Sequence, residues 1–231
     1  MLIILHIYYK TEETIKKIIE KFNLQVDRDE YLIASYENPE RFMRELCNKI
    51  YTHCDERSKI RAILCNVYFL SIYNKYQTAK ELFVRSHIYE IIQAFKDHQL
   101  KILFNRTLAQ LGLAAFRIGE YVNSHSYLHP LCSTGTTKLK EYLSQSYNKE
   151  NEKSLLFDKE DKKRMTPYIM TINIDEVEST YYIVSMIIDL PNIVLSKLGK
   201  SHKPFNPLFK KLLDNYTKQV YIINTDIQWT S

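Results

Sequence analysis

The sequence predicts an all-α fold, a right-handed superhelical stack of antiparallel helix pairs. Glycine and proline are sparse, with four Gly and six Pro in 231 residues, and this favours long helices over a turn-rich β fold. Apolar residues recur at helical spacing along most of the chain. A helix, a tight turn and a second helix can also be recognised at the centre of the sequence. We therefore expect no β-sheet of any size.

The central stretch, residues 101–121, is the segment around which the fold is predicted to be organised. Its apolar or small residues follow i, i+3, i+4 spacing, which is typical of an amphipathic helix. They are Leu103, Phe104, Thr107, Leu108, Leu111, Ala114, Ala115 and Ile118. Gly112 and Ala115 are small enough to let a neighbouring helix come close. Gly119 is expected to end the helix in the left-handed conformation that a Cβ would penalise, and Tyr121 opens an antiparallel partner.

Before this pair, the apolar pattern predicts a first helix over residues 4–23, in which Thr11 can cap a break or a second start. Residues 24–37 are expected to form a loop of mixed charge. Asn38, followed by proline and glutamate, is a strong start signal, and the helix that it opens is expected to run to about His53.

Asp55 is expected to cap the next helix. The second helix of that pair is predicted as one element from about Tyr76 to Phe95. The organising pair follows over residues 99–118 and 120–131. Pro130 is expected to mark its end, because proline cannot continue the helical hydrogen bonding.

Gly135 precedes a short predicted helix over residues 136–147, and the charge-rich residues 148–166 read as an exposed loop. The expected organisation is a helical-repeat array over residues 1–147, this loop over 148–166, further helices of the array over 167–218, and a C-terminal tail or truncated start of the next module over 219–231.

A long helix is predicted after the loop, from Asn173 or Asp175 to Leu190. Pro191 is expected to break it, with a short helix continuing over residues 192–199.

Charge is unevenly distributed within a formal net charge of +5, which permits contact with nucleic acid without demanding it. Residues 166–190 hold four acidic side chains and no Lys or Arg, whereas residues 196–218 hold six lysines and one acid. The lysines are Lys197, Lys200, Lys203, Lys210, Lys211 and Lys218. We take them as candidate contacts for RNA or a protein partner. The segment interleaves Phe205, Phe209 and Tyr216 with the lysines, so the alternative is a solvated helix face over a buried aromatic stripe.

The residues show no pattern that indicates catalysis, a metal or a cofactor, and we expect none. The four cysteines are Cys47, Cys54, Cys65 and Cys132. They form no C-x-x-C pair, so they predict buried, reduced thiols in a cytoplasmic protein. His125 and His129 share an i, i+4 face without an adjoining third ligand, so a solvated face is favoured. We recognise no targeting segment and no membrane span.

The string LGLAAFRIGEY over residues 111–121 matches the first helix and turn of a tetratricopeptide repeat. Ser124 stands where the second helix of that repeat has alanine, and serine is still small. This match predicts a helical-repeat scaffold with surfaces suited to protein binding.

Three longer strings carry a more specific resemblance. They are ILFNRTLAQLGLAAFRIGEY, RAILCNVYFLSIYNKYQTAKELF and TPYIMTINIDEVESTYYIVSMIIDLP. Together they resemble the C subunits of eukaryotic translation initiation factor 3, from about residue 6 to about Lys211. The resemblance implies the tetratricopeptide-like array of a PCI domain, here a fragment of the central array with the winged helix missing or incomplete.

The same resemblance implies a non-catalytic scaffold subunit that organises other initiation factor 3 subunits, especially PCI subunits, on the small ribosomal subunit. It implies a cytoplasmic protein without membrane contact, and it allows contact with ribosomal RNA. It carries over no catalytic or cofactor residues. The alternatives are a PCI-type scaffold of the proteasome lid or signalosome, a direct RNA-binding helical module, and an enzyme whose site is assembled from residues remote in sequence.

Overall fold

The computed structural model describes residues 2–23, 38–94, 97–133, 135–143, 170–197, 209–211 and 214–216. These residues form helices and connecting turns, with no strand among them, so the all-α class is confirmed. The helices are α1 (Leu2–Ile7), α2 (Glu12–Asn23), α4 (Pro39–His53), α5 (Glu56–Ile72), α6 (Tyr76–Arg85), α7 (Ile88–Ala94), α8 (His98–Ile118), α9 (Tyr121–Cys132), α10 (Thr136–Tyr142) and α12 (Ile174–Lys197). The right hand of the superhelix stays a prediction.

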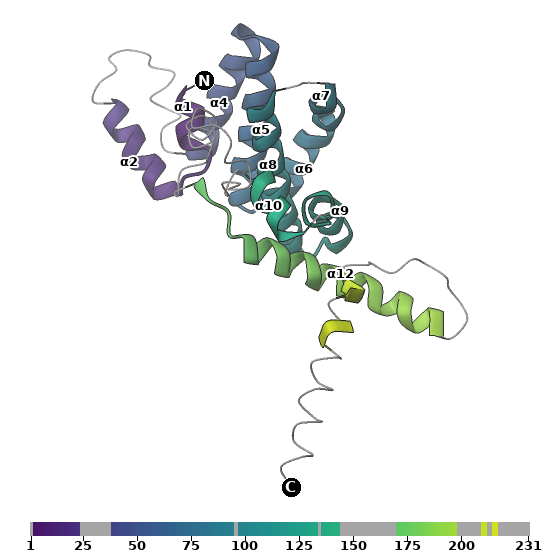
Figure 1. Ribbon diagram of the computed structural model, residues 1–231. Coiled ribbons are helices and arrows are strands. Elements are labelled where there is room, and N and C mark those ends of the chain that lie inside the picture. Colours follow the sequence, from purple (N-terminus) through teal and green to yellow (C-terminus); the bar gives the residue numbers. More distant parts are fainter. Residues whose placement is uncertain are drawn as a thin grey trace, which may run out of the picture.

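Helix α8 lies at the centre of the array (Figure 1). It packs against α5 on one side and α9 on another, and it also touches α6, α7, α10 and α12. Buried residues surround α8 on every side between Leu100 and Ala115, as expected for a helix inside a core rather than at its surface. The prediction that this stretch organises the fold is therefore confirmed.

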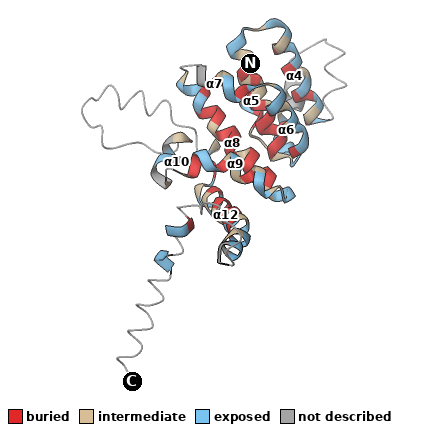
Figure 2. Ribbon diagram, turned by 90° about the vertical axis from the view of Figure 1, so that its right-hand side faces the viewer, coloured by how far each residue is buried: buried red, intermediate tan, exposed pale blue. Residues whose placement is uncertain are grey.

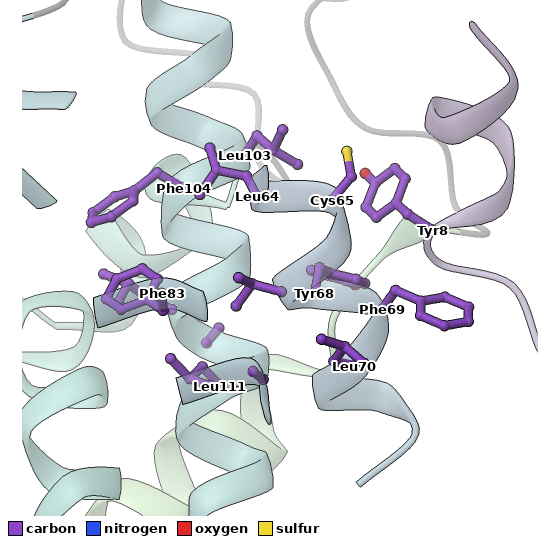
Figure 3. Close-up of a cluster of buried hydrophobic side chains, with 14 of the residues drawn as sticks. Tyr8, Leu64, Cys65, Tyr68, Phe69, Leu70, Phe83, Leu103, Phe104 and Leu111 are labelled. Carbon is purple, nitrogen blue, oxygen red and sulfur yellow. The ribbon is translucent and has the colours of Figure 1, made fainter. Parts of the chain in front are cut away.

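One continuous core runs from α1 to α12. In it the Tyr8 ring, which follows α1, meets Tyr68 of α5 edge to face, with 5.0 Å between ring centroids, and Phe83 stacks on Phe104 at 6.1 Å. Figure 3 shows these rings with Leu64 between the layers of helices. Aromatic pairs at such separations stabilise the core beyond the effect of the apolar area that they bury.

The helix starts follow local signals in the sequence. The side chain of Asn38 accepts a hydrogen bond from the Glu40 backbone N–H at 3.0 Å, and α4 begins at Pro39 as predicted. Asp55 stands at the N-cap position of α5. The predicted first helix over residues 4–23 is divided in two, because α1 ends at Ile7 and α2 begins at Glu12; the second start follows Thr11, where the sequence allowed one.

The prediction of a single helix from Tyr76 to about Phe95 is wrong. The chain turns at Ser86 and His87 and divides this stretch into α6 and α7. The Ser86 hydroxyl donates to the Phe83 carbonyl at 2.9 Å, and His87 adopts a positive φ of 49°. A left-handed residue cannot continue a right-handed helix.

The predicted helix break at Pro191 is also wrong, because α12 continues through Pro191 to Lys197. Helix α9 contains Pro130 and ends at Cys132, one residue beyond the predicted end at 131, so that end is confirmed. Near Pro191 the Asn192 side chain donates to the Ile188 carbonyl at 3.0 Å. Each proline removes one backbone hydrogen bond, and the packing of the surrounding helix outweighs that loss. The expected loops over residues 24–37 and 148–166 lie outside the described residues, as does the tail after residue 218.

Candidate functional site

The α8–α9 hairpin is held by a close approach of its two helices. A Cβ built on Gly112 would lie 2.5 Å from Cδ2 of Leu128, inside van der Waals contact. The buried Ser124 hydroxyl donates to the Gly112 carbonyl at 2.9 Å. The predicted close approach is thus confirmed, and serine in place of the repeat's alanine adds a hydrogen bond between the helices.

Gly119 ends α8 as predicted, with a φ of +89°. The Gly119 N–H donates to the Phe116 carbonyl at 3.0 Å, and the Glu120 N–H donates to the Ala115 carbonyl at 2.9 Å. This pair of bonds is the Schellman motif, which satisfies carbonyls that a helix end leaves without partners. The residues of the repeat motif therefore serve to pack α8 closely against α9 and to turn the chain between the two helices.

The histidine pair on α9 lies on a face that is solvated in part, as expected, because His129 is exposed and His125 is partly buried. The rings of His125 and His129 stack at 5.4 Å, and His125 also stacks on the buried ring of Tyr181 at 5.4 Å. Nδ1 of His129 lies 3.0 Å from the Tyr181 hydroxyl. Burial lowers the pKa of His125, and His129 adds to this while Asp189 opposes it. The pair joins α9 to α12, a role that depends on a residue 52 positions away.

The cysteines are packing residues rather than ligands. Cys47, Cys65 and Cys132 are buried and Cys54 is partly buried, all as free thiols. Burial raises the pKa of the three buried thiols, so they are poor nucleophiles and poor metal ligands at neutral pH. Within the part of the chain that the structure describes, no three His, Cys, Asp or Glu side chains could hold a metal ion.

Arg106 is a buried charge that the sequence pattern had not singled out. Its side chain is 1% exposed, and its Nη2 donates to the Met170 carbonyl just before α12. Its guanidinium carbon lies 5.9 Å from the Tyr68 ring centroid, in cation–π range. Nε and Nη1 make no hydrogen bond of sound geometry, but the guanidinium lies near the Tyr8 and Tyr68 hydroxyls and opposes the rise that burial causes in their pKa. The sequence did contain a signal for this burial, because Arg106 follows Leu103 by three residues and so falls on the apolar face of the helix.

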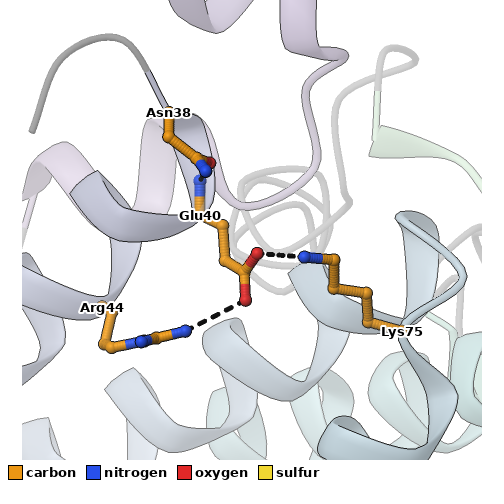
Figure 4. Close-up of polar contacts among 4 residues, drawn as sticks. All are labelled: Asn38, Glu40, Arg44 and Lys75. Atoms are coloured by element: carbon orange, nitrogen blue, oxygen red, sulfur yellow. Dashed lines mark hydrogen bonds and ion pairs between the residues drawn. The ribbon is translucent and has the colours of Figure 1, made fainter.

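Ion pairs tie neighbouring elements together at the surface. The Glu40 carboxylate forms an ion pair with the Arg44 guanidinium at 3.1 Å. It forms a second ion pair with Lys75, which lies just before α6 (Figure 4). The hydrogen bond from Lys75 is the main cause that lowers the pKa of the Glu40 carboxyl. Arg57 and Asp97 form a similar bridge between the starts of α5 and α8. These contacts fix the relative positions of helices. Glu40 and Lys75 also line a groove of about 150 Å³, whose other lining residues are Glu12, Asn38, Pro39, Phe69, Leu70 and Tyr73.

A groove of about 210 Å³ lies between α7, α8, α9 and α10. It is lined by Tyr89, Ile92, Phe104, Asn105, Leu108, Pro130, Leu131 and Tyr142. None of these carries a charge, and the Asn105 amide already donates to the Tyr142 carbonyl at 3.3 Å. The groove therefore offers apolar contact rather than acid–base or nucleophilic groups.

The basic segment is described only in part. Lys210 and Lys211 are exposed beside the buried ring of Phe209, and Lys197 is the last residue of α12. Lys200, Lys203 and Lys218 lie outside the described residues. The role of the six lysines stays a prediction.

None of the helices in the described ranges is both long enough and apolar enough to cross a membrane.

Comparisons with known proteins agree with the resemblance found in the sequence. A family model described as "Eukaryotic translation initiation factor 3 subunit 8 N-terminus" matches residues 1–198. The C subunit of eukaryotic translation initiation factor 3 from Caenorhabditis elegans is 38% identical over 165 residues, which cover 71% of this chain and 18% of the relative. The protein of the same name from Mycosarcoma maydis is 30% identical over 233 residues, which cover 94% of this chain and 26% of the relative.

The chain thus spans about a quarter or less of the length of these relatives, while the family match covers most of the chain itself. The match includes the helices from α1 to α12 that build the core. From this extent of similarity, we conclude that the chain belongs to the C-subunit family of eukaryotic translation initiation factor 3.

Proposed function

We propose that this chain is a non-catalytic scaffold subunit of the translation initiation factor 3 complex. In this role its stacked helices organise other subunits on the small ribosomal subunit during translation initiation. The observation that carries the proposal is the similarity to relatives named as the C subunit of that factor, which extends over as much as 94% of the chain. The relatives are named for the initiation factor, so a scaffold of the proteasome lid or signalosome is not proposed.

The geometry of the hairpin supports a scaffold role. Gly112, Gly119 and Ser124 are used for close packing and for turning the chain, and the buried cysteines fill the core. The groove between α7 and α10 has an apolar lining without charged groups. A stack of this kind presents side chains on extended helical faces, which suit protein binding.

Co-sedimentation with purified small ribosomal subunits tests the proposal. The full chain is added alone, and then together with purified PCI subunits of the same factor. We expect it to enter the ribosomal pellet when those subunits are present. A chain that stays in the supernatant under both conditions, while the added subunits pellet normally, would contradict the scaffold role.

Direct binding to RNA is a second candidate, and the exposure of the adjacent lysines Lys210 and Lys211 favours it. Contacts of lysines with phosphate would be independent of sequence and weakened by salt. The double variant Lys210→Glu/Lys211→Glu should then lose retention of RNA on a nitrocellulose filter. Lys138→Glu/Lys140→Glu, at two exposed lysines of α10, serves as the matched control. Equal retention by both variants, or no retention by the unaltered chain at low salt, would exclude this function.

A further inference from the structure

Arg106 is a buried positive charge near the middle of the helical stack. It projects from α8, the central helix, and almost none of its surface reaches solvent. Within the described ranges, no carboxylate forms an ion pair with it. A buried charge without an opposite charge is costly. The groups that surround Arg106 must therefore supply the stabilisation that water would otherwise provide.

The first of these groups comes from the residues that lead into α12. We call residues 170–173 the α12 lead. Nη2 of Arg106 donates to the Met170 carbonyl at the start of this lead. Ile172, two residues later, is buried in the core, and α12 begins at Ile174. Arg106 thus holds the backbone that positions the first turn of α12.

The second group comes from the N-terminal end of the chain. Tyr8, which follows α1, is buried, and its hydroxyl lies near the Arg106 guanidinium together with the hydroxyl of Tyr68. Figure 3 shows the Tyr8 side chain directed from the end of α1 towards Tyr68 on α5. The oxygen atoms of these hydroxyls and the face of the Tyr68 ring, 5.9 Å from the guanidinium carbon, stabilise the charge.

The two groups belong to parts of the molecule that otherwise pack separately. Helix α1 packs chiefly against α4 and α5, whereas α12 packs chiefly against α8, α9 and α10. Figures 1 and 2 both place the N-terminus and α12 towards opposite ends of the stack, with the buried residues of α5 and α8 between them. Arg106 is therefore a single side chain that both ends of the stack share.

We propose that Arg106 couples the two ends of the stack, so that the packing of α1 and the packing of the α12 lead depend on each other. Release of the lead lets water reach the guanidinium. This hydration gains more free energy when the Tyr8 hydroxyl has been withdrawn, because the charge is then less well stabilised in the closed state. A change that moves α1 should therefore loosen the start of α12, and the reverse must also hold.

Hydrogen exchange of the full chain, followed by mass spectrometry, tests the proposal. Tyr8→Phe removes the hydroxyl and keeps the ring. We expect it to speed the exchange of residues 172–177 about fivefold or more, a range that includes the Val177 N–H bonded to the Asn173 carbonyl. The matched control is Tyr9→Phe, because it removes the same group from the next residue, whose ring contacts Tyr8 and Lys10.

The Arg106→Met variant shows whether the effect passes through the charge. In that background, Tyr8→Phe should leave the exchange of residues 172–177 unchanged, because no charge remains to be hydrated. An effect of Tyr8→Phe that persists without Arg106 would overturn the proposal. Equal exchange in Tyr8→Phe, Tyr9→Phe and the unaltered chain would do the same. Far-UV circular dichroism of each variant confirms that it has folded.

The reverse direction is tested from the α12 side. Ile172→Ala weakens the packing of the α12 lead and should speed exchange at the Tyr8 N–H, which is bonded to the Ile4 carbonyl at the end of α1. Val184→Ala is the matched control, because Val184 is also buried on α12 but lies ten residues beyond its start. Equal exchange at the end of α1 in the two variants would contradict the coupling.

Discussion

Substituting Gly112 with alanine tests whether the α8–α9 contact depends on the missing side chain. The new Cβ would lie 2.5 Å from Cδ2 and 2.7 Å from Cγ of Leu128, which is itself fully buried. Both atoms are closer than a real Cβ contact permits, so Leu128 or the whole of α9 must move. Movement of α9 would also lengthen the 2.9 Å hydrogen bond from Ser124 to the Gly112 carbonyl.

Two effects of opposite sign decide how much Gly112→Ala changes the free energy of unfolding. Overpacking a core by one carbon lowers the free energy of unfolding by about 1–3 kcal/mol. Alanine is favoured over glycine inside a helix by about 1 kcal/mol. We therefore expect Gly112→Ala to lower the free energy of unfolding by about 1 kcal/mol, with the clash as the larger contribution.

A double-mutant cycle with Leu128→Ala separates these effects. Leu128→Ala alone should cost about 2–5 kcal/mol, but it removes the atoms that meet the new Cβ. In that background Gly112→Ala should become stabilising by about 1 kcal/mol. The assay is urea unfolding followed by far-UV circular dichroism, which reports helix content. A coupling energy below about 0.5 kcal/mol would refute the reasoning, because independent sites add to within that range.

Three further predictions concern the turn, the buried charge and the histidine pair. Gly119→Ala should lower the free energy of unfolding by about 1 kcal/mol through backbone strain alone, because a Cβ there has no atom within 4 Å; an unchanged urea midpoint would contradict this. Arg106→Met should leave that free energy unchanged or higher, because it removes a buried charge with two unpaired N–H groups, whereas Arg106→Ala should lower it by about 2–4 kcal/mol through the cavity. Equal losses in both Arg106 variants would show that its hydrogen bond to the Met170 carbonyl dominates. The pKa of His125 is lowered in the folded chain, so the unfolded chain binds more protons and stability should fall as the pH drops below about 6.5. His125→Gln should flatten that part of the pH profile in thermal melts, and an identical profile would argue against burial as the cause.

The helical class and the helix ends that depend on local chemistry could be predicted from the amino-acid sequence alone. The start at Asn38 and Pro39 follows from a side chain that satisfies a free N–H within its own turn. The end at Gly119 follows from a conformation that disfavours a Cβ. The close approach at Gly112 was also predictable, because a small residue on an apolar face leaves room for a neighbour. The three strings within residues 61–191 were sufficient to indicate the family that the comparisons confirm.

Features that depend on residues distant in the chain could not be predicted in this way, because they follow from how the helices pack. Pro130 and Pro191 remain inside helices because packing outweighs a lost hydrogen bond. His125 is only partly exposed, because the Tyr181 ring from α12 stacks on it. Helical spacing shows that α12 is apolar on two sides, but it cannot tell which side is packed. The position of α9 settles that question and leaves Ile183, Leu190 and Val194 exposed. Side-chain burial depends on contacts between elements that no local pattern records.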